Sequence, residues 1–213
     1  MKTCLIVSGG EFNDLPVNVD ANCIIACDRG YEHVKRTGLT PDIIIGDYDS
    51  MSLESIEADL KARGLTEVKI LRFPSHKDDS DTMLAVKHAL SEGYDNIVLT
   101  CALGGRFDHS FANIQTMAYA VEHGAACTLY GEGEILYVIK NGSLSLKVPK
   151  SRALSVFSLS DESRSVTVKG TLYEAENITL TNRFPLGLSN MQVRDSATVS
   201  VGEGILLVTE SDL

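Results

Sequence analysis

Four short segments combine aspartates with glycines or basic residues, as is typical of sites that bind metal ions and phosphates. They are residues 28–30 (Asp-Arg-Gly), 46–50 (Gly-Asp-Tyr-Asp-Ser), 77–81 (Lys-Asp-Asp-Ser-Asp) and 104–109 (Gly-Gly-Arg-Phe-Asp-His). Carboxylate oxygens, with few histidines and no clustered cysteines, favour Mg²⁺ over zinc. We therefore expect magnesium, bound directly or through water, at Asp47, Asp49, Asp78 and Asp81.

The glycines and basic side chains of these segments are suited to a polyphosphate. Gly9-Gly10 and Gly104-Gly105 would let backbone amides approach phosphate oxygens closely. Arg106 offers a planar guanidinium group and Lys77 a compact charge. The two common nucleotide-binding fingerprints, G-x-x-x-x-G-K-[ST] and G-x-G-x-x-G, do not occur in the sequence.

All four segments adjoin predicted strands of a parallel sheet. Apolar runs rich in Ile, Val and Leu alternate with helical patterns over the first 130 residues, and a glycine follows each helix. Since the carboxyl ends of parallel strands share one edge of a sheet, the segments should converge there. The expected strands are 4–7, 23–27, 42–45, 68–73, 97–100 and 126–130, and the expected helices are 28–37, 52–63, 79–92 and 108–123.

The second part of the sequence changes to short alternating runs separated by turn residues such as Asn141-Gly142. This pattern predicts an antiparallel sandwich. The fold class is thus α/β, with an N-terminal mostly parallel α/β sheet domain (1–132) followed by a C-terminal antiparallel β-sandwich domain (133–213). The expected strands of the second domain are 135–139, 144–148, 154–159, 166–168, 178–180, 191–193, 197–201 and 205–208.

Composition excludes several classes of protein. The 213 residues include 19 basic and 29 acidic ones, giving a net charge of −10, which argues against nucleic-acid binding. No apolar run approaches the roughly 20 residues that span a bilayer, and the apolar start is too short for a signal peptide. We expect a cytoplasmic protein without membrane partners, whose five cysteines are reduced and buried. Seven aspartates lie in the four segments, so much of the acidic excess is expected at one site.

Each segment taken alone also fits a structural role. Asp28 and Asp108 fit helix N-caps. Residues 46–50 fit a surface turn, and residues 78–81 a solvated helix start. The expected convergence of all four segments at one sheet edge favours a functional site.

The histidines show no spacing typical of metal ligands. His109 and Asn113 are four residues apart, which fits an ordinary pair on one helix face. The remaining histidines are expected at the surface: His33, His76, His88 and His123.

Together the segments resemble the thiamine pyrophosphokinase family. The G-D-x-D-S and G-G-R-x-D-H elements are specific in combination. The similarity extends in order over nearly the whole chain, through Asp28-Arg29-Gly30, residues 41–50, 77–81 and 104–109, Asn113, Phe184-Pro185-Leu186 and Ser189-Asn190.

The resemblance implies transfer of a pyrophosphoryl group from ATP to the thiamine hydroxyl, in a homodimer with active sites at the subunit interface. It implies Mg²⁺ at the four aspartates named above, with Asp81 as the first candidate base and Asp47 as the next. Ser189 and Asn190, with Asp49, would contact thiamine. The expected ATP contacts are Asp28, Gly30, Lys77, Gly105, Arg106, Asp108, His109 and Asn113.

Two other functions are compatible with the residues themselves. A magnesium-dependent phosphohydrolase would use the same carboxylates with water as the nucleophile, and thiamine-dependent AMP formation separates it from the first function. The other is a nucleotide or thiamine sensor without catalysis. The presence of all four aspartates argues against it, because binding alone does not require them.

Overall fold

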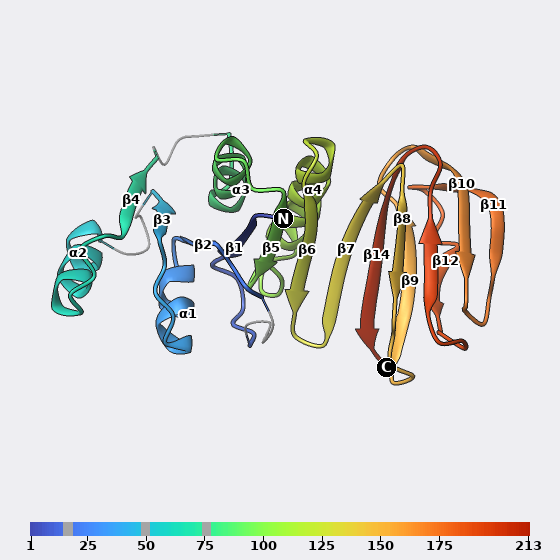
Figure 1. The fold of residues 1–213 in the computed structure, drawn as a ribbon, viewed down its shortest axis with the longest axis horizontal. Helices are drawn as coiled ribbons and strands as arrows, with labels where there is room; N and C mark the ends of the chain where they lie inside the picture. The colour runs from blue at the N-terminus through green and yellow to red at the C-terminus, as the bar shows by residue number, and fades with distance from the viewer. Residues whose placement is uncertain (15–18, 48–51, 74–77) are drawn as a thin grey trace. The chain divides into compact units, whose positions relative to one another are not determined.

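The computed structural model describes residues 1–14, 19–47, 52–73 and 78–213 of the chain. They divide into two units, Met1–Glu132 (unit 1) and Gly133–Leu213 (unit 2). Figure 1 shows helices and strands in unit 1 and strands alone in unit 2. The predicted fold class, a mostly parallel α/β sheet followed by an antiparallel β-sandwich, is confirmed.

The sheet of unit 1 is parallel throughout, in the strand order β6-β5-β1-β2-β3-β4. Its central strand β1 pairs with β5 on one side and β2 on the other, and all five of its residues are buried. Burial on both faces explains why the central strands are almost purely apolar in the sequence. The strand bounds are β1 Thr3–Val7, β2 Cys23–Cys27, β3 Ile43–Gly46, β4 Lys69–Arg72, β5 Asn96–Thr100 and β6 Ala126–Gly131.

Four helices cover the two faces of this sheet: α1 (Gly30–Thr37), α2 (Leu53–Ala62), α3 (Asp81–Ser91) and α4 (Phe107–Glu122). Helices α1 and α2 lie on one face, and α3 and α4 lie on the other (Figure 1). Tyr31 of α1 and Ile56 of α2 are almost fully buried, against alternate residues of the strands such as Leu5. The helices change faces at β1, where an open α/β sheet forms its ligand crevice.

The helices end at the predicted residue or one residue before it, whereas all four helix starts differ from the predicted ones by one or two residues. Gly38, Gly64, Gly93 and Gly124 all have positive φ values of 70–89°, as a left-handed helix end requires. Asp28 and Asp108 are not N-caps, because Arg29 and Arg106 occupy those positions without a side-chain cap. Helix α3 begins at Asp81 rather than Asp79, since the Ser80 hydroxyl accepts the N–H of Met83.

Unit 2 is a sandwich of two antiparallel sheets, in the strand orders β12-β9-β14-β7 and β11-β10-β13-β8. Leu154 and Leu206 from one sheet pack with Val166 and Val199 from the other in a single buried core. The strand bounds are β7 Glu134–Lys140, β8 Ser143–Leu146, β9 Arg152–Ser158, β10 Glu162–Lys169, β11 Ala175–Thr181, β12 Gly187–Asn190, β13 Ala197–Ser200 and β14 Ile205–Asp212.

Two predictions, one about a strand and one about the cysteines, have definite outcomes. The expected strand 191–193 is wrong, because the strand ends at Asn190, whose side-chain oxygen accepts the N–H of Met191. The five cysteines are buried and free, as expected. No helix of the described residues has the length and apolar character needed to cross a membrane.

Gly30 provides a test of how tightly α1 packs on the sheet. A Cβ atom at Gly30 would lie 2.1 Å from the carbonyl oxygen of Val7, at the end of β1. We expect Gly30→Ala to lower the free energy of unfolding by about 1–3 kcal/mol, although alanine is the better helix former. Urea unfolding followed by circular dichroism measures the change.

The matched control is Gly142→Ala, where the added Cβ would lie 3.4 Å from its nearest neighbour. This variant should unfold at nearly the same urea concentration as the parent chain. Equal stability of the Gly30 and Gly142 variants would contradict the packing argument.

Candidate active site

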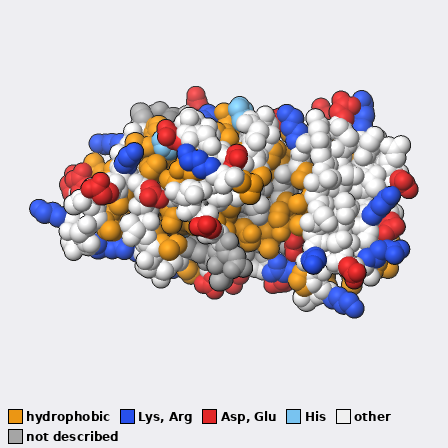
Figure 2. Space-filling model, viewed as in Figure 1, with side chains coloured by type: hydrophobic (Ala, Val, Ile, Leu, Met, Phe, Trp, Pro, Cys, Tyr) orange, Lys and Arg blue, Asp and Glu red, His pale blue; other side chains and the backbone are white. Residues whose placement is uncertain are grey.

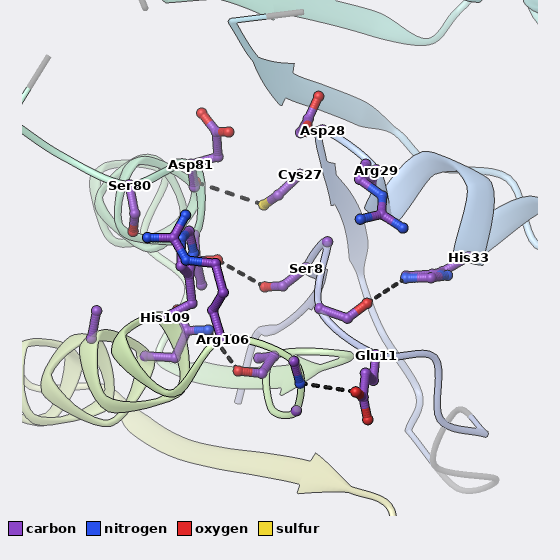
Figure 3. Close-up of a pocket in the computed structure, with 18 of the residues that line it drawn as sticks. Ser8, Glu11, Cys27, Asp28, Arg29, His33, Ser80, Asp81, Arg106 and His109 are labelled. Atoms are coloured by element: carbon purple, nitrogen blue, oxygen red, sulfur yellow. Dashed lines mark hydrogen bonds between the residues drawn. The ribbon is translucent and has the colours of Figure 1, made fainter. Parts of the chain in front are cut away.

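A cavity of about 830 Å³ lies at the carboxyl edge of the sheet in unit 1, where β1, β2, β3 and β5 end. It is therefore formed by loops that are far apart in the sequence (Figure 3). The lining residues are 8–12, 27–29, 79–82, Ala102, 104–106, His33, Arg36, Asp47, His109, Ala112 and Asn113.

Most of the predicted site residues of unit 1 line this one cavity. Those that do are Asp28, Asp47, Asp81, Gly105, Arg106, His109 and Asn113. Gly30, Asp78 and Asp108 belong to the same loops but do not line it. Asp49 and Lys77 lie outside the described residues, so their predicted roles stay predictions.

Asp81 is the first residue of α3, and contacts to two strand ends fix its position. The backbone carbonyl of Asp81 accepts a hydrogen bond from the Cys27 thiol, at 3.7 Å. The hydroxyls of Ser8 and Thr82 are hydrogen-bonded at 2.9 Å. In Figure 3 the carboxylates of Asp28 and Asp81 point the same way, on either side of Cys27. A carboxylate in the first turn of a helix is also favoured by the helix dipole.

The carboxylate of Asp79 is paired with a lysine of α3. Both of its carboxylate oxygens accept hydrogen bonds from the Lys87 ammonium, at 2.7 and 2.9 Å. These bonds raise the pKa of Lys87 above its usual value. Because Lys87 lies two turns along α3, the ion pair ties the segment before the helix to the helix itself.

The glycine-rich loop after β5 leads directly into α4. Gly104 and Gly105 have φ values of +81° and +63°, a conformation that favours glycine. The side-chain amide of Asn113, which is buried, donates to the carbonyl oxygen of Ala102 at 2.7 Å and so holds the start of this loop. Arg106 follows the glycines as the N-cap of α4.

Arg106 and Asp108 form an exposed ion pair, in which Nε of Arg106 donates to Oδ1 of Asp108 at 3.1 Å. Hydrogen bonding to Arg106 lowers the pKa of the Asp108 carboxyl below its usual value. Asp108 thus orients the guanidinium group at the cavity without lining the cavity itself.

Sequence reasoning missed several lining residues. His33, expected at the surface, is 6% exposed, and its Nε2 is hydrogen-bonded to the carbonyl oxygen of Gly10 at 2.9 Å. The Phe12 ring packs on His33 at a centroid distance of 5.5 Å, and the Arg36 guanidinium lies 5.3 Å from the centre of the same ring. Glu11 also lines the cavity, and its carboxylate accepts a hydrogen bond from the backbone N–H of Gly105. These contacts come from the irregular loop after β1, which has no local sequence pattern to reveal them.

The charges of the cavity are mixed in sign. Carboxylates from Asp28, Asp47 and Asp81 share it with the guanidinium groups of Arg29 and Arg106. Figure 2 likewise shows acidic and basic side chains interspersed over unit 1 on the face that it displays. Among the described residues, no group of three or more His, Cys, Asp or Glu is arranged to hold a metal ion. Mg²⁺ usually takes only one or two protein carboxylates and completes its shell with water and phosphates, so oxygen donors of this kind fit it.

The two predicted thiamine residues, Ser189 and Asn190, lie in unit 2 on β12. All hydrogen-bonding positions of the Asn190 amide are used within that unit. Its oxygen accepts the N–H groups of Tyr173 and Met191, and its nitrogen donates to the Thr171 hydroxyl and the Tyr173 carbonyl. Asn190 therefore orders the loop at Tyr173. Ser189 is exposed, with a φ of +57°.

Comparison with known proteins gives consistent matches. The family model described as thiamin pyrophosphokinase, catalytic domain, matches residues 17–129. The chain is 28% identical over 216 residues to the thiamine pyrophosphokinase of Bacillus subtilis (strain 168), with 99% of each sequence covered.

Solved structures show the same similarity over the full length. The crystal structure of thiamine pyrophosphokinase from Bacillus subtilis superposes with a TM-score of 0.88 at 26% identity, covering 100% of both chains. That of thiamin pyrophosphokinase from Geobacillus thermodenitrificans superposes with a TM-score of 0.83 at 25% identity, covering 99% of this chain and 98% of the other.

Proposed function

The chain belongs to the thiamin pyrophosphokinase family, and from that premise we propose that it transfers the terminal pyrophosphoryl group of ATP to the hydroxyl of thiamine. Thiamine is the acceptor that family membership supports. ATP as the donor, and thiamine diphosphate with AMP as the products, are the proposed details. In the reaction the thiamine oxygen bonds to the β-phosphorus, the bond from that phosphorus to the bridging oxygen of AMP breaks, and the hydroxyl proton passes to a base.

The observation that supports this reaction best is the composition of the cavity in unit 1. Carboxylates of Asp47 and Asp81, a glycine loop with positive φ values, and the guanidinium group of Arg106 all line it. Phosphoryl transfer requires positioning and neutralisation of charge more than covalent chemistry, and these groups are suited to both tasks. Backbone amides and arginine bind phosphate oxygens, whereas carboxylates bind a cation.

We propose that Asp47 and Asp81, with Asp49 and Asp78, hold Mg²⁺ directly or through water. The ion, when bound, supplies neutralisation of the phosphate charge that builds up as AMP leaves. Asp81 is the proposed base because it lines the cavity at the fixed start of α3. A carboxylate is a sufficient base if the hydroxyl loses its proton late, after it is aligned with the β-phosphorus.

For the nucleotide we propose contacts from the loops of unit 1. Arg106 is oriented by Asp108, and Asn113 holds the start of the glycine loop that contains Gly105. Asp28 and His109 line the same cavity and are the proposed contacts to the rest of ATP, and Lys77 is a further proposed phosphate ligand. Gly30 serves this site indirectly, because its lack of a side chain lets α1 approach the end of β1.

We also propose a homodimer whose active sites combine the cavity with β12 of the other subunit, where Ser189 would contact thiamine. Large apolar side chains are exposed on both units, and surface of this kind is suited to contact with a second subunit. On α4, Phe107 and Phe111 stack at a centroid distance of 6.2 Å. On unit 2 the exposed apolar residues include Leu172, Tyr173, Phe184, Leu186, Leu188 and Val193.

The reaction is tested by analysing the products formed from ATP, thiamine and Mg²⁺ by mass spectrometry. We expect AMP and thiamine diphosphate in equal amounts, because a single transfer produces both. Omission of thiamine should abolish AMP formation. ADP or free phosphate as the main product would point to a phosphohydrolase, and binding of the substrates without turnover would point to a sensor.

Asp81→Asn tests the proposed base. The change keeps the shape of the side chain but removes its basicity, so kcat should fall by about 10²–10⁴-fold while thiamine binding, followed by calorimetry, stays measurable. Asp79→Asn is the matched control, because Asp79 carries the same charge in the same segment but is bound by Lys87. Equal losses in the two variants would remove Asp81 from its assigned role.

The homodimer is tested by light scattering coupled to size-exclusion chromatography. We expect a mass of twice the 23.1 kDa chain. Replacement of both Leu186 and Leu188 by serine should shift the mass toward a monomer and reduce activity together with it, because apolar contact area is lost. Full activity in a monomeric chain would contradict an interfacial active site.

A further inference from the structure

The segment that follows β1 is hydrogen-bonded through its backbone to the segment that follows β5. The backbone N–H groups of Ser8, Gly10 and Glu11 donate to the carbonyl oxygens of residues 100, 101 and 103, at 3.0, 2.8 and 3.1 Å. The hydrogen bonding of the two parallel strands thus continues beyond their ends, into the loops that line the cavity.

The side chain of Glu11 adds the next bond in this series. Its Oε1 accepts the backbone N–H of Gly105 at 2.9 Å (Figure 3). The same side chain lies flat against Gly104, since a Cβ atom there would come within 2.5–2.8 Å of the Glu11 side-chain atoms. A bond from a carboxylate to a backbone amide is charge-assisted and stronger than a neutral one.

This contact falls where the loop has most conformational freedom. Gly104 and Gly105 are consecutive glycines with positive φ, and glycine has the largest backbone entropy to lose on ordering. Arg106 follows immediately, so the direction of its side chain depends on how these two glycines are held.

We propose that Glu11 is a positioning residue of the active site, which holds the Gly104-Gly105 turn and, through it, sets Arg106 in place for the phosphates of the nucleotide. The role of Arg106 rests on the function proposed above. Glu11 itself touches neither the phosphates nor the reacting atoms in this role. A competing role is that the carboxylate occupies the Gly105 amide in place of a phosphate and so blocks binding.

The two roles predict opposite changes in the Glu11→Ala variant. If Glu11 positions the turn, KM for ATP should rise about three- to tenfold, as loss of one hydrogen bond implies, with a smaller change in kcat. Removal of a negative charge would by itself favour ATP binding, so a rise in KM cannot result from the change of charge. Glu11→Gln keeps an acceptor oxygen and should restore most of the affinity.

The control is Glu122→Ala, which removes the same charge from the exposed end of α4 and should leave KM unchanged. A fall in KM for ATP in Glu11→Ala would overturn the proposal in favour of blocking. An unchanged KM would overturn it as well.

Hydrogen exchange measured by mass spectrometry separates this proposal from the proposed function. Peptides that contain residues 104–106 should exchange faster in Glu11→Ala than in the parent chain or in Glu122→Ala, whichever reaction the protein performs. Unchanged exchange would show that Glu11 does not hold the turn. Faster exchange in a chain that forms no thiamine diphosphate would refute the proposed function but keep the anchoring role.

Discussion

The parallel pairing of β5, β1 and β2 is the constraint on which the cavity depends. Parallel strands present all their carboxyl ends at one edge, so every loop that leaves this edge must share the same space. In this chain those loops carry aspartates, which repel one another when brought together. Arginines from the same loops and the start of α3 lie at the same edge, where positive charge and the helix dipole offset that repulsion.

The alternating pattern of unit 1 could be predicted because its physical causes are local. Buried parallel strands must be apolar on both faces, and a helix that ends in the left-handed conformation favours glycine. The observed strands differ from the predicted ones by at most one residue at either end. Helix starts were harder to predict. Aspartate is common at N-caps, but Asp28 instead lies in the turn between β2 and α1 with a φ of +46°.

The anchoring contacts could not be predicted, because they join residues far apart in the sequence through irregular loops. Glu11 and Gly105 are 94 residues apart, and nothing around Glu11 marks it as an anchor. His33 was assigned to the surface since it lacks metal-ligand spacing, yet it is buried by Phe12 and bound to Gly10. Asn190 has the residue type of a ligand contact, but its amide is used within its own unit.

The net charge of −10 can now be divided between different roles. Seven aspartates fall in the four segments of the sequence, but Asp79 is neutralised by Lys87 and Asp108 by Arg106. These two pairs orient the segments before and within α3 and α4. Asp79 lines the cavity with its charge already paired, and Asp28, Asp47 and Asp81 line it as well. The negative charge that a cation must balance is therefore smaller than the seven aspartates of the four segments imply. This reduction lets so many carboxylates occupy one sheet edge in a folded chain.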